Sequence, residues 1–288
     1  MIQAQPRFIL TLSCPSAAGQ VAAVSGFLDA RGGYIDELSV FDDELSQRFF
    51  IRCVFHTGNT DAALLPRLRA EFAPIAERFT MQWQLNDAAA RTRTLILVSK
   101  LDHCLNDLLY RWKLGELALD IAGIMSNHPD LEPIARSYGL PYHHLPISAD
   151  TKAAQEAKLL ELVESTGSEL VILARYMQIL SNQTAAQLSG RAINIHHSFL
   201  PGFKGAKPYH QAYARGVKLI GATAHYVTDD LDEGPIIEQV VERVDHTHKP
   251  EQLQATGRDM ECLALARAVK YHTERRVFPN GDRTVVFR

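Results

Sequence analysis

The feature that most constrains the fold is a change of pattern near residues 87–93. Upstream, short strand-forming runs and two amphipathic helical stretches follow one another closely; downstream, apolar strands alternate with longer helical patterns. The segment between them reads NDAAARTR from residue 86 and has no large apolar side chain to anchor it in a core. A chain of 288 residues is long enough for two domains. The pattern therefore predicts a first domain at 1–86, a linker at 87–93 and a second domain at 94–288.

The first domain has six predicted elements in the order strand, helix, strand, strand, helix, strand. This order is typical of the ferredoxin-like split βαβ fold. The middle two strands form a hairpin, since the polar turn DDE at 42–44 separates them. The elements are strands at 8–12, 34–40, 48–55 and 79–85, with helices at 19–30 and 60–78.

The second domain contains strands that are apolar on both faces and alternate with helices. Such strands are typical of a parallel sheet covered by helices on both sides, so we expect a Rossmann-like, mostly parallel α/β domain. A late pair of strands at 219–227 and 235–244 is expected to be antiparallel. The remaining predicted elements are strands at 94–98, 117–125, 169–173 and 192–195, and helices at 102–112, 131–138, 152–164 and 250–274.

Composition narrows the class of partner to a small molecule. The formal net charge of −3 shows no basic excess of the kind that binds nucleic acid. No run approaches the roughly 20 apolar residues that span a bilayer, and the N-terminus lacks the apolar core of a secretory signal. The four cysteines are scattered without CxxC spacing, which favours reduced thiols over disulfides or metal ligation. We expect a cytoplasmic protein that contacts neither membrane nor nucleic acid.

Unusual polar residues gather at the end of the predicted strand 192–195. Alternation along a strand places Asn194 and His196 on one face, so an amide and an imidazole converge on one reacting carbonyl. In open α/β sheets, ligands sit at the carboxyl ends of the strands. A second cluster, HYVTDDLDEGP from His225, offers a carboxylate that orients the imidazole or exchanges protons with it.

Two long segments resemble the folate-dependent formyltransferase family, and within it the deformylases. They read NIHHSFLPGFKGAKPYHQA from Asn194 and GATAHYVTDDLDEGPII from Gly221. The first domain, with CPSAAGQVAAVSGFL from Cys14 and FFIR from Phe49, is similar to an ACT domain. The resemblance implies an enzyme that hydrolyses 10-formyltetrahydrofolate to tetrahydrofolate and formate, supplying formate for purine synthesis and balancing the one-carbon folate pool.

The resemblance also assigns roles to residues. It implies that Asn194 and His196 donate hydrogen bonds to the oxyanion formed at the formyl group, and that Asp232 handles protons. We expect no metal ion, because the sequence has no HExxH or CxxC spacing and an imidazole that donates to an oxyanion is not free to bind a metal. We expect no tightly bound cofactor either, since the resemblance makes the folate the substrate. The resemblance places His225 and His197 in supporting positions, and a folate pocket at Arg175, Tyr176, Met177, Gln178, Ile179, Leu180, Thr228, Asp229, Asp230 and Leu231.

The formyl acceptor is expected to be water. In transferases that formylate a phosphorylated amine, a glycine-rich loop cradles the phosphate at a helix N-terminus. Here that loop reads SKLDHCL from Ser99, without glycine and with Asp102 where the anion would arrive. His197 stands where the transferases have proline and matches the deformylases. Two alternatives stay open: an amine formyltransferase, and a non-catalytic regulator that senses folate or an amino acid.

The ACT resemblance implies glycine or methionine as an effector and a homodimer or homotetramer. Relatives carry an aspartate after the Cys-Pro pair, whereas this chain has Ser16, Ala17 and Ala18 there. That acid would bind the amino group of an effector. The sequence therefore leaves two alternatives for the first domain, a weak effector site or assembly alone.

Overall fold

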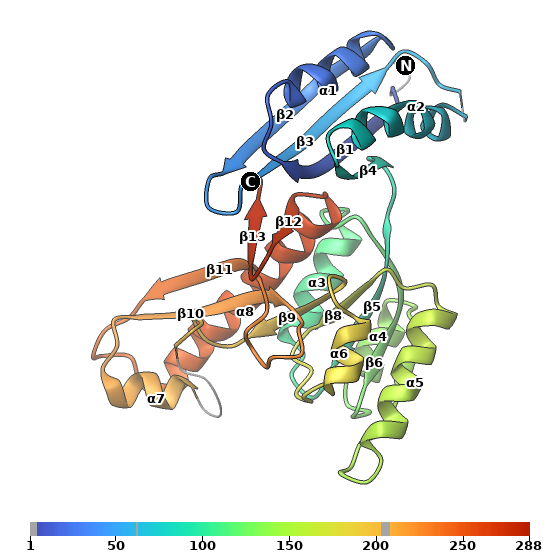
Figure 1. Cartoon of the computed structure of the whole chain (residues 1–288). Helices are drawn as coiled ribbons and strands as arrows, with labels where there is room; N and C mark the ends of the chain where they lie inside the picture. Colours follow the sequence, from blue (N-terminus) through green and yellow to red (C-terminus); the bar gives the residue numbers. More distant parts are fainter. Residues whose placement is uncertain (1–4, 62, 203–207) are drawn as a thin grey trace. The chain divides into compact units, whose positions relative to one another are not determined.

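The computed structural model describes residues 5–61, 63–202 and 208–288 and divides the chain into two compact units (Figure 1). Unit 1 comprises residues up to Ala90 together with 274–280 and 285–288; unit 2 comprises 91–273 and 281–284. The division falls inside the expected linker, but the C-terminal end of the expected second domain groups with unit 1. Phe278 packs edge-on against Phe50 with ring centroids 5.8 Å apart, and Asn280 Nδ2 donates to Asp43 Oδ2 at 2.7 Å.

Unit 1 has the predicted ferredoxin-like order and an antiparallel sheet with strand order β2-β3-β1-β4. Its helices bury one apolar face each, and Phe72 makes edge contacts with Phe27 and Trp83 at centroid distances of 5.1 and 4.9 Å. The second helix begins four residues later than expected, because Asn59 and Asp61 form side-chain turns ahead of it. The elements are β1 (Arg7–Pro15), α1 (Gln20–Asp29), β2 (Gly33–Asp43), β3 (Arg48–Thr57), α2 (Leu64–Arg78) and β4 (Gln82–Asp87).

Unit 2 is built on a seven-stranded sheet of order β11-β10-β9-β8-β5-β6-β7. The five strands from β9 to β7 are parallel, and β10 and β11 add an antiparallel edge. This confirms the mostly parallel α/β fold and the late antiparallel pair. The strands are β5 (Thr92–Val98), β6 (Leu119–Ser126), β7 (Tyr142–His144), β8 (Leu170–Leu173), β9 (Ala192–His196), β10 (Leu219–Tyr226) and β11 (Ile236–Arg243).

The helices of unit 2 follow the predicted α/β alternation, with two short additions. The sequence did not predict α6, α7 or β7, each of which is eight residues or shorter, nor the two short C-terminal strands β12 (Val277–Asn280) and β13 (Arg283–Val286). The long helix α8 packs against α3 and against strands β9, β10 and β11 (Figure 1). The helices are α3 (His103–Lys113), α4 (Glu132–Ser137), α5 (Lys152–Ser165), α6 (Asn182–Gln187), α7 (Pro208–Arg215) and α8 (Pro250–Thr273).

The antiparallel pairing of β9 with β10 positions the polar cluster identified in the sequence. His196 lies opposite Thr223, and Asn194 lies opposite His225. The loop that joins β10 to β11 follows directly and carries the acidic segment. Within the described residues, no helix is long and apolar enough to cross a membrane.

Candidate active site

Asn194 and His225 form a directly paired amide and imidazole across the two strands. Asn194 Nδ2 lies 3.2 Å from His225 Nε2, and His225 Nδ1 lies 2.8 Å from the carbonyl oxygen of Tyr226. A carbonyl only accepts hydrogen bonds, so Nδ1 carries the proton and Nε2 accepts from the Asn194 amide. Burial lowers the pKa of His225 more than the bond to Tyr226 raises it, so the ring is neutral. The second amide hydrogen of Asn194 is left for a substrate oxygen.

His196 and Asp232 form the second pair of the site. His196 Nδ1 lies 3.1 Å from Asp232 Oδ1, with side-chain exposures of 6% and 14%. Burial alone would raise the pKa of Asp232, but the hydrogen bond from His196 and electrostatic attraction to the surrounding histidines outweigh burial and hold that pKa below its usual range. The other ring nitrogen, Nε2, is buried and has no hydrogen-bond partner among the described residues. The pair therefore offers an ionised carboxylate and an imidazole with one nitrogen unused.

The backbone around the site adopts strained conformations at two of its residues. Asp232 has φ of 58° and Arg175 has φ of 64°, in the left-handed region that costs non-glycine residues about 1 kcal/mol or more. The turn after Asp232 also requires Gly234, because a Cβ there would lie 1.8 Å from the Tyr226 carbonyl oxygen. This tight turn brings the Asp232 carboxylate back to the ends of β9 and β10.

The side chains of Asn194, His196, His225 and Asp232 line one cavity of about 550 Å³. We call it the folate pocket, after the ligand that the family resemblance implies. Every site residue predicted from the sequence borders it. The volume is within the range of pockets that hold small organic ligands. Its lining includes Arg175, Tyr176, Met177, Gln178, Ile179, Leu180, Asn194, His196, His197, His225, Thr228, Asp229, Asp230, Leu231 and Asp232.

The residues of the predicted pocket segment 175–180 play different parts. Tyr176 packs in the apolar core, and its hydroxyl accepts a hydrogen bond from Gln155 Nε2 at 2.8 Å, so this side chain supports the pocket. Met177 and Ile179 are instead exposed. Met177 donates its backbone N–H to Ser99 Oγ at 3.0 Å, and Ser99 in turn donates to Asn127 Oδ1 at 2.7 Å.

Ser99, Asn127 and Gln155 were missed by sequence reasoning although each holds part of the pocket in place. All three are buried polar residues. Ser99 and Asn127 directly follow β5 and β6, at the carboxyl edge of the sheet. Polar side chains at that edge, after apolar strands, were the available signal. Ser99 is 28 residues from Asn127 and 78 from Met177, and Gln155 is 21 residues from Tyr176, so these contacts gave no local pattern.

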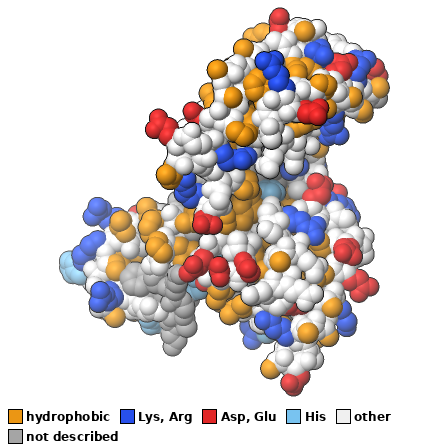
Figure 2. Space-filling model, in the orientation of Figure 1, with side chains coloured by type: hydrophobic (Ala, Val, Ile, Leu, Met, Phe, Trp, Pro, Cys, Tyr) orange, Lys and Arg blue, Asp and Glu red, His pale blue; other side chains and the backbone are white. Residues whose placement is uncertain are grey.

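The rim of the folate pocket is acidic. Asp229 and Asp230 are exposed on the loop between β10 and β11. Figure 2 shows acidic side chains gathered over the place where this loop lies in Figure 1. Asp232, deeper in the same loop, is turned toward His196.

His197 faces a second polar environment beside the folate pocket. Burial, together with the positive charges of Arg175 and His196, lowers its pKa to about 4, so the ring is neutral near pH 7. Its ring centroid lies 5.1 Å from that of His196 and 6.5 Å from that of Tyr209. His197 therefore contacts both the His196 ring and Tyr209 of α7. Residues 203–207 of the same sequence motif lie outside the described residues.

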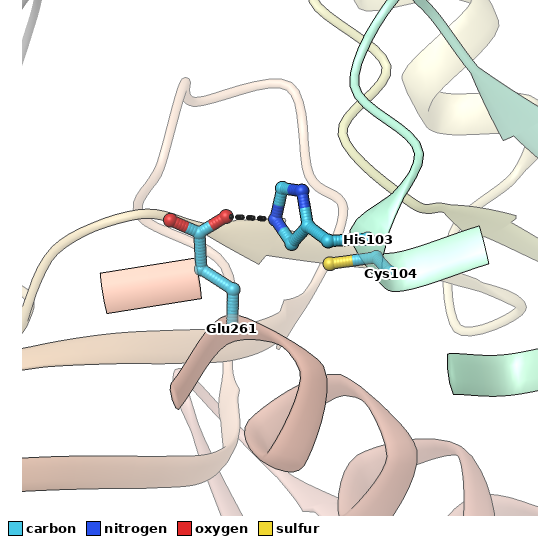
Figure 3. Close-up of side chains that lie close together, drawn as sticks. All are labelled: His103, Cys104 and Glu261. Atoms are coloured by element: carbon cyan, nitrogen blue, oxygen red, sulfur yellow. Dashed lines mark hydrogen bonds and ion pairs between the residues drawn. The ribbon is translucent and has the colours of Figure 1, made fainter. Parts of the chain in front are cut away.

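A second carboxylate–histidine pair lies on α8 and α3. His103, Cys104 and Glu261 place one ligand atom each within 4.8 Å of one another, as Figure 3 shows. Glu261 Oε2 lies 2.8 Å from His103 Nε2 and 3.3 Å from Arg175 Nε, and Tyr209 donates to Oε1 at 2.9 Å. The positively charged guanidinium of Arg175, so close to Glu261, opposes the binding of a metal ion there. The carboxylate is used instead in a protein-internal network.

The loop expected to exclude a phosphate is as the sequence suggested. Asp102 occupies the position before α3 and is exposed, with Asn106 Nδ2 donating to its carboxylate at 3.0 Å. A helix N-terminus attracts anions through its free N–H groups. Here the chain's own carboxylate stands at that end, where it repels a phosphate.

Comparisons with known proteins identify the family. Residues 92–269 match the model of the formyl transferase family. A protein of Corynebacterium sp. (strain P-1) named formyltetrahydrofolate deformylase is 55% identical over 99% of both chains. One of Bacillus subtilis with the same name is 46% identical over 96% of this chain and 93% of its own length.

Solved structures agree with the sequence comparisons. The crystal structure of formyltetrahydrofolate deformylase from Burkholderia mallei is 70% identical, covers 98% of this chain and 100% of its own, and has a TM-score of 0.94. A glycinamide ribonucleotide transformylase from Symbiobacterium toebii is 31% identical and covers only 69% of this chain, with a TM-score of 0.65. The chain therefore belongs to the formyltetrahydrofolate deformylases within the formyl transferase family.

Proposed function

We propose that this protein hydrolyses 10-formyltetrahydrofolate to tetrahydrofolate and formate. The observation that carries the proposal is the arrangement of Asn194, His196 and Asp232 around one pocket. The Asn194 amide has a hydrogen to spare and His196 has an unused buried nitrogen. The amide is a donor as it stands, and Nε2 becomes one when the His196 ring is protonated; both then suit an oxygen that becomes negative when the formyl carbon turns tetrahedral. The names of relatives that match along nearly the full chain agree.

In the proposed reaction the oxygen of water forms a bond to the formyl carbon. The carbonyl electron pair moves to the formyl oxygen, which Asn194 and His196 stabilise by roughly 3 kcal/mol per donor. Asp232 accepts the proton that the water loses. The oxyanion then re-forms the C=O bond, the bond to N10 breaks, and the electron pair of N10 takes up the proton held by Asp232. Tetrahydrofolate and formic acid result, and the acid loses its remaining proton to water to become formate. No metal ion or further cofactor takes part.

Asp232 has a second effect through its charge. At 3.1 Å it stabilises a protonated His196, and the resulting N–H at Nε2 is the stronger donor to the oxyanion. The neutral His225 holds the Asn194 amide in the donating orientation, because its Nε2 accepts one of the two amide hydrogens. Arg175 and the acidic loop complete the pocket around the folate.

Regulation and assembly form part of the proposal. Unit 1 carries a cavity of about 320 Å³ lined by Ser16, Gly19, Gln20, Asp42 and Phe49, among others. Its one lining acid, Asp42, already accepts a hydrogen bond from Ser16 Oγ at 2.5 Å. We expect glycine and methionine to bind there weakly, with the unit acting as an ACT domain that assembles a homodimer or homotetramer in the cytoplasm.

The test is release of formate from 10-formyltetrahydrofolate with no amine present. We expect stoichiometric formate and tetrahydrofolate, measured by a coupled formate assay and by absorbance. Glycinamide ribonucleotide should be neither formylated nor inhibitory, because Asp102 stands at the phosphate position. Formylation of the amine at a rate comparable to formate release would make the protein a transferase. Folate binding without any turnover would make it a regulator.

A further inference from the structure

A second, smaller cavity lies on the other side of His197 from the folate pocket. It measures about 140 Å³, and we call it the polar cavity. It shares Arg175 and His197 with the folate pocket, so these two side chains border both spaces. The lining residues are Leu101, His103, Arg175, His197, Tyr209, His210, Gln254, Arg258 and Glu261.

The two cavities carry opposite formal charge. With histidines neutral, the polar cavity has two arginines and one glutamate, a charge of +1. The folate pocket has three aspartates and one arginine, a charge of −2. An anion formed between them is therefore repelled by the folate side and attracted to the polar cavity.

Glu261 is the one acidic residue that lines the polar cavity, and neighbouring side chains of the protein already offset its negative charge. Glu261 is bound by His103 and Tyr209 and faces Arg175. Arg258 is then the cation left to attract a ligand, while Arg175, which faces Glu261, keeps an unused hydrogen-bond donor. Arg175 is 8% exposed and its Nε is buried without a hydrogen-bond partner among the described residues. Arg258 is exposed and makes no ion pair within the described part of the chain.

One side of the polar cavity depends on a glycine, Gly257, within helix α8. A Cβ on Gly257 would lie 2.0 Å from Tyr209 Oη, so only glycine lets the tyrosine reach Glu261 one turn further along. Glycine inside a helix is destabilising relative to alanine. Gly257 therefore lies at the position of α8 against which Tyr209, a lining residue of the polar cavity, packs.

We propose that the polar cavity binds the formate product and is the path by which formate leaves. This rests on the proposed hydrolysis. A planar carboxylate of three heavy atoms fits a 140 Å³ space that excludes a folate. Guanidinium groups match carboxylates in charge and geometry. Formate passes from the catalytic pair past His197 to Arg175 and exits at Arg258, while tetrahydrofolate leaves through the folate pocket.

The test is inhibition of the full-length enzyme by sodium formate, with ionic strength held constant by sodium chloride. For the Arg258→Gln variant, the rate measured with formate is divided by the rate of the same variant without formate. We expect its inhibition constant for formate to rise about tenfold, because a charged hydrogen-bond partner is lost. Arg258→Lys keeps the positive charge but loses the paired N–H donors of the guanidinium, so its inhibition constant should be intermediate. The matched control is Arg267→Gln, an exposed arginine of the same helix outside the cavity, which should behave as the parent.

An unchanged inhibition constant in a folded Arg258→Gln variant would overturn the proposal. A change in Asp230→Asn but not in Arg258→Gln would also overturn it, because formate would then bind on the folate side. Failure of the proposed hydrolysis gives a different result, namely no formate released by the parent. In that case NMR titration of the parent and of Arg258→Gln with carbon-13 formate still tests the cavity by direct binding.

Discussion

Unit 2 contains two buried carboxylate–histidine pairs that look alike and differ in how completely they are bonded. Asp232 pairs with His196 at 3.1 Å and Glu261 with His103 at 2.8 Å. In both, hydrogen bonds and positive charge outweigh burial and hold the carboxyl pKa below its usual range. Glu261 has its carboxylate engaged by further groups, and it lies in a regular helix. The Asp232 pair leaves His196 Nε2 buried and unpaired among the described residues, on a loop with a left-handed residue.

The difference separates a structural pair from a reactive one. A buried polar atom without a partner costs about 1–3 kcal/mol, so it persists where a ligand completes it. Both pairs join a carboxylate to an imidazole. What distinguishes them is the unused nitrogen of His196 and the strained backbone at Asp232, both facing the folate pocket.

The largest expected effect is on the reactive pair. His196→Ala should reduce formate release by roughly 1,000-fold or more, because it removes an oxyanion donor and the cation that Asp232 stabilises. The double variant with Asp232→Asn should be little slower than either single variant, since the two groups act as a unit. The measurement is a single-turnover rate, with His248→Ala, a histidine outside both cavities, as control. Multiplicative losses in the double variant would show that the two residues act separately.

Asn194→Ala should have a smaller effect. Loss of one oxyanion donor costs roughly 100- to 1,000-fold in kcat, and KM should change little, because the contact strengthens only in the transition state. Asn106→Ala, which removes an exposed amide at α3, is the matched control. Steady-state kinetics with 10-formyltetrahydrofolate decides the matter. A rise in KM at constant kcat would make Asn194 a ground-state binding residue.

The role of the Glu261–His103 pair is tested by measuring the stability of variants that disturb it. Gly257→Ala should lower the free energy of unfolding by about 2 kcal/mol, since the new methyl group meets Tyr209 and displaces it from Glu261. Gly26→Ala in α1 is the control: a Cβ added there would have no atom within 4 Å, so alanine should stabilise by about 0.5–1 kcal/mol. Calorimetry of both variants measures this. If Gly257→Ala were as stabilising as Gly26→Ala, Tyr209 would not depend on that glycine.

The smallest expected effect is a pH dependence at His197, which lies between the two pairs. Its pKa falls from 6.5 to about 4 in the folded protein, so below pH 6.5 the unfolded state binds more protons. Stability is therefore lost as the pH falls from 6.5 toward 4. His197→Asn should reduce the difference in unfolding free energy between pH 7 and pH 5 by about 1.8 kcal/mol, measured by urea denaturation. An equal difference in parent and variant would contradict the buried, neutral state of His197.

The reactive pair could be predicted from the sequence, and the structural pair could not. Strand alternation predicted that Asn194 and His196 share one face, and the family resemblance selected Asp232 among the acids of its loop. The structure places Asp232 3.1 Å from His196. Tyr209 and Glu261 are separated by 52 residues, and His103 and Glu261 by 158. Local periodicity carries no information about such contacts, because they depend on how α3, α7 and α8 pack.

The contrast between local patterns and distant contacts also explains which parts of the fold the sequence predicted. Long elements with clear periodicity, such as α5, α8, β3 and β10, lie where the sequence predicted them, and β4 lies at 82–87 instead of 79–85. The three-residue strand β7 and the six-residue helix α6 are too short for a periodic signal. The grouping of the C-terminal end with unit 1 depends on contacts of Phe278 and Asn280 with residues more than 200 positions earlier.

The most direct test of the distinction is one amide substitution in each pair, compared in the same assay. Asp232→Asn keeps the shape but cannot accept a proton, so formate release should fall by roughly 1,000-fold or more while folate binding is retained. Glu261→Gln should lower stability by about 3 kcal/mol, because Arg175 loses its buried counter-charge, and should reduce the rate by less than about tenfold. If folded, folate-binding Asp232→Asn turned over within about tenfold of the parent, Asp232 would not be the group that handles the proton.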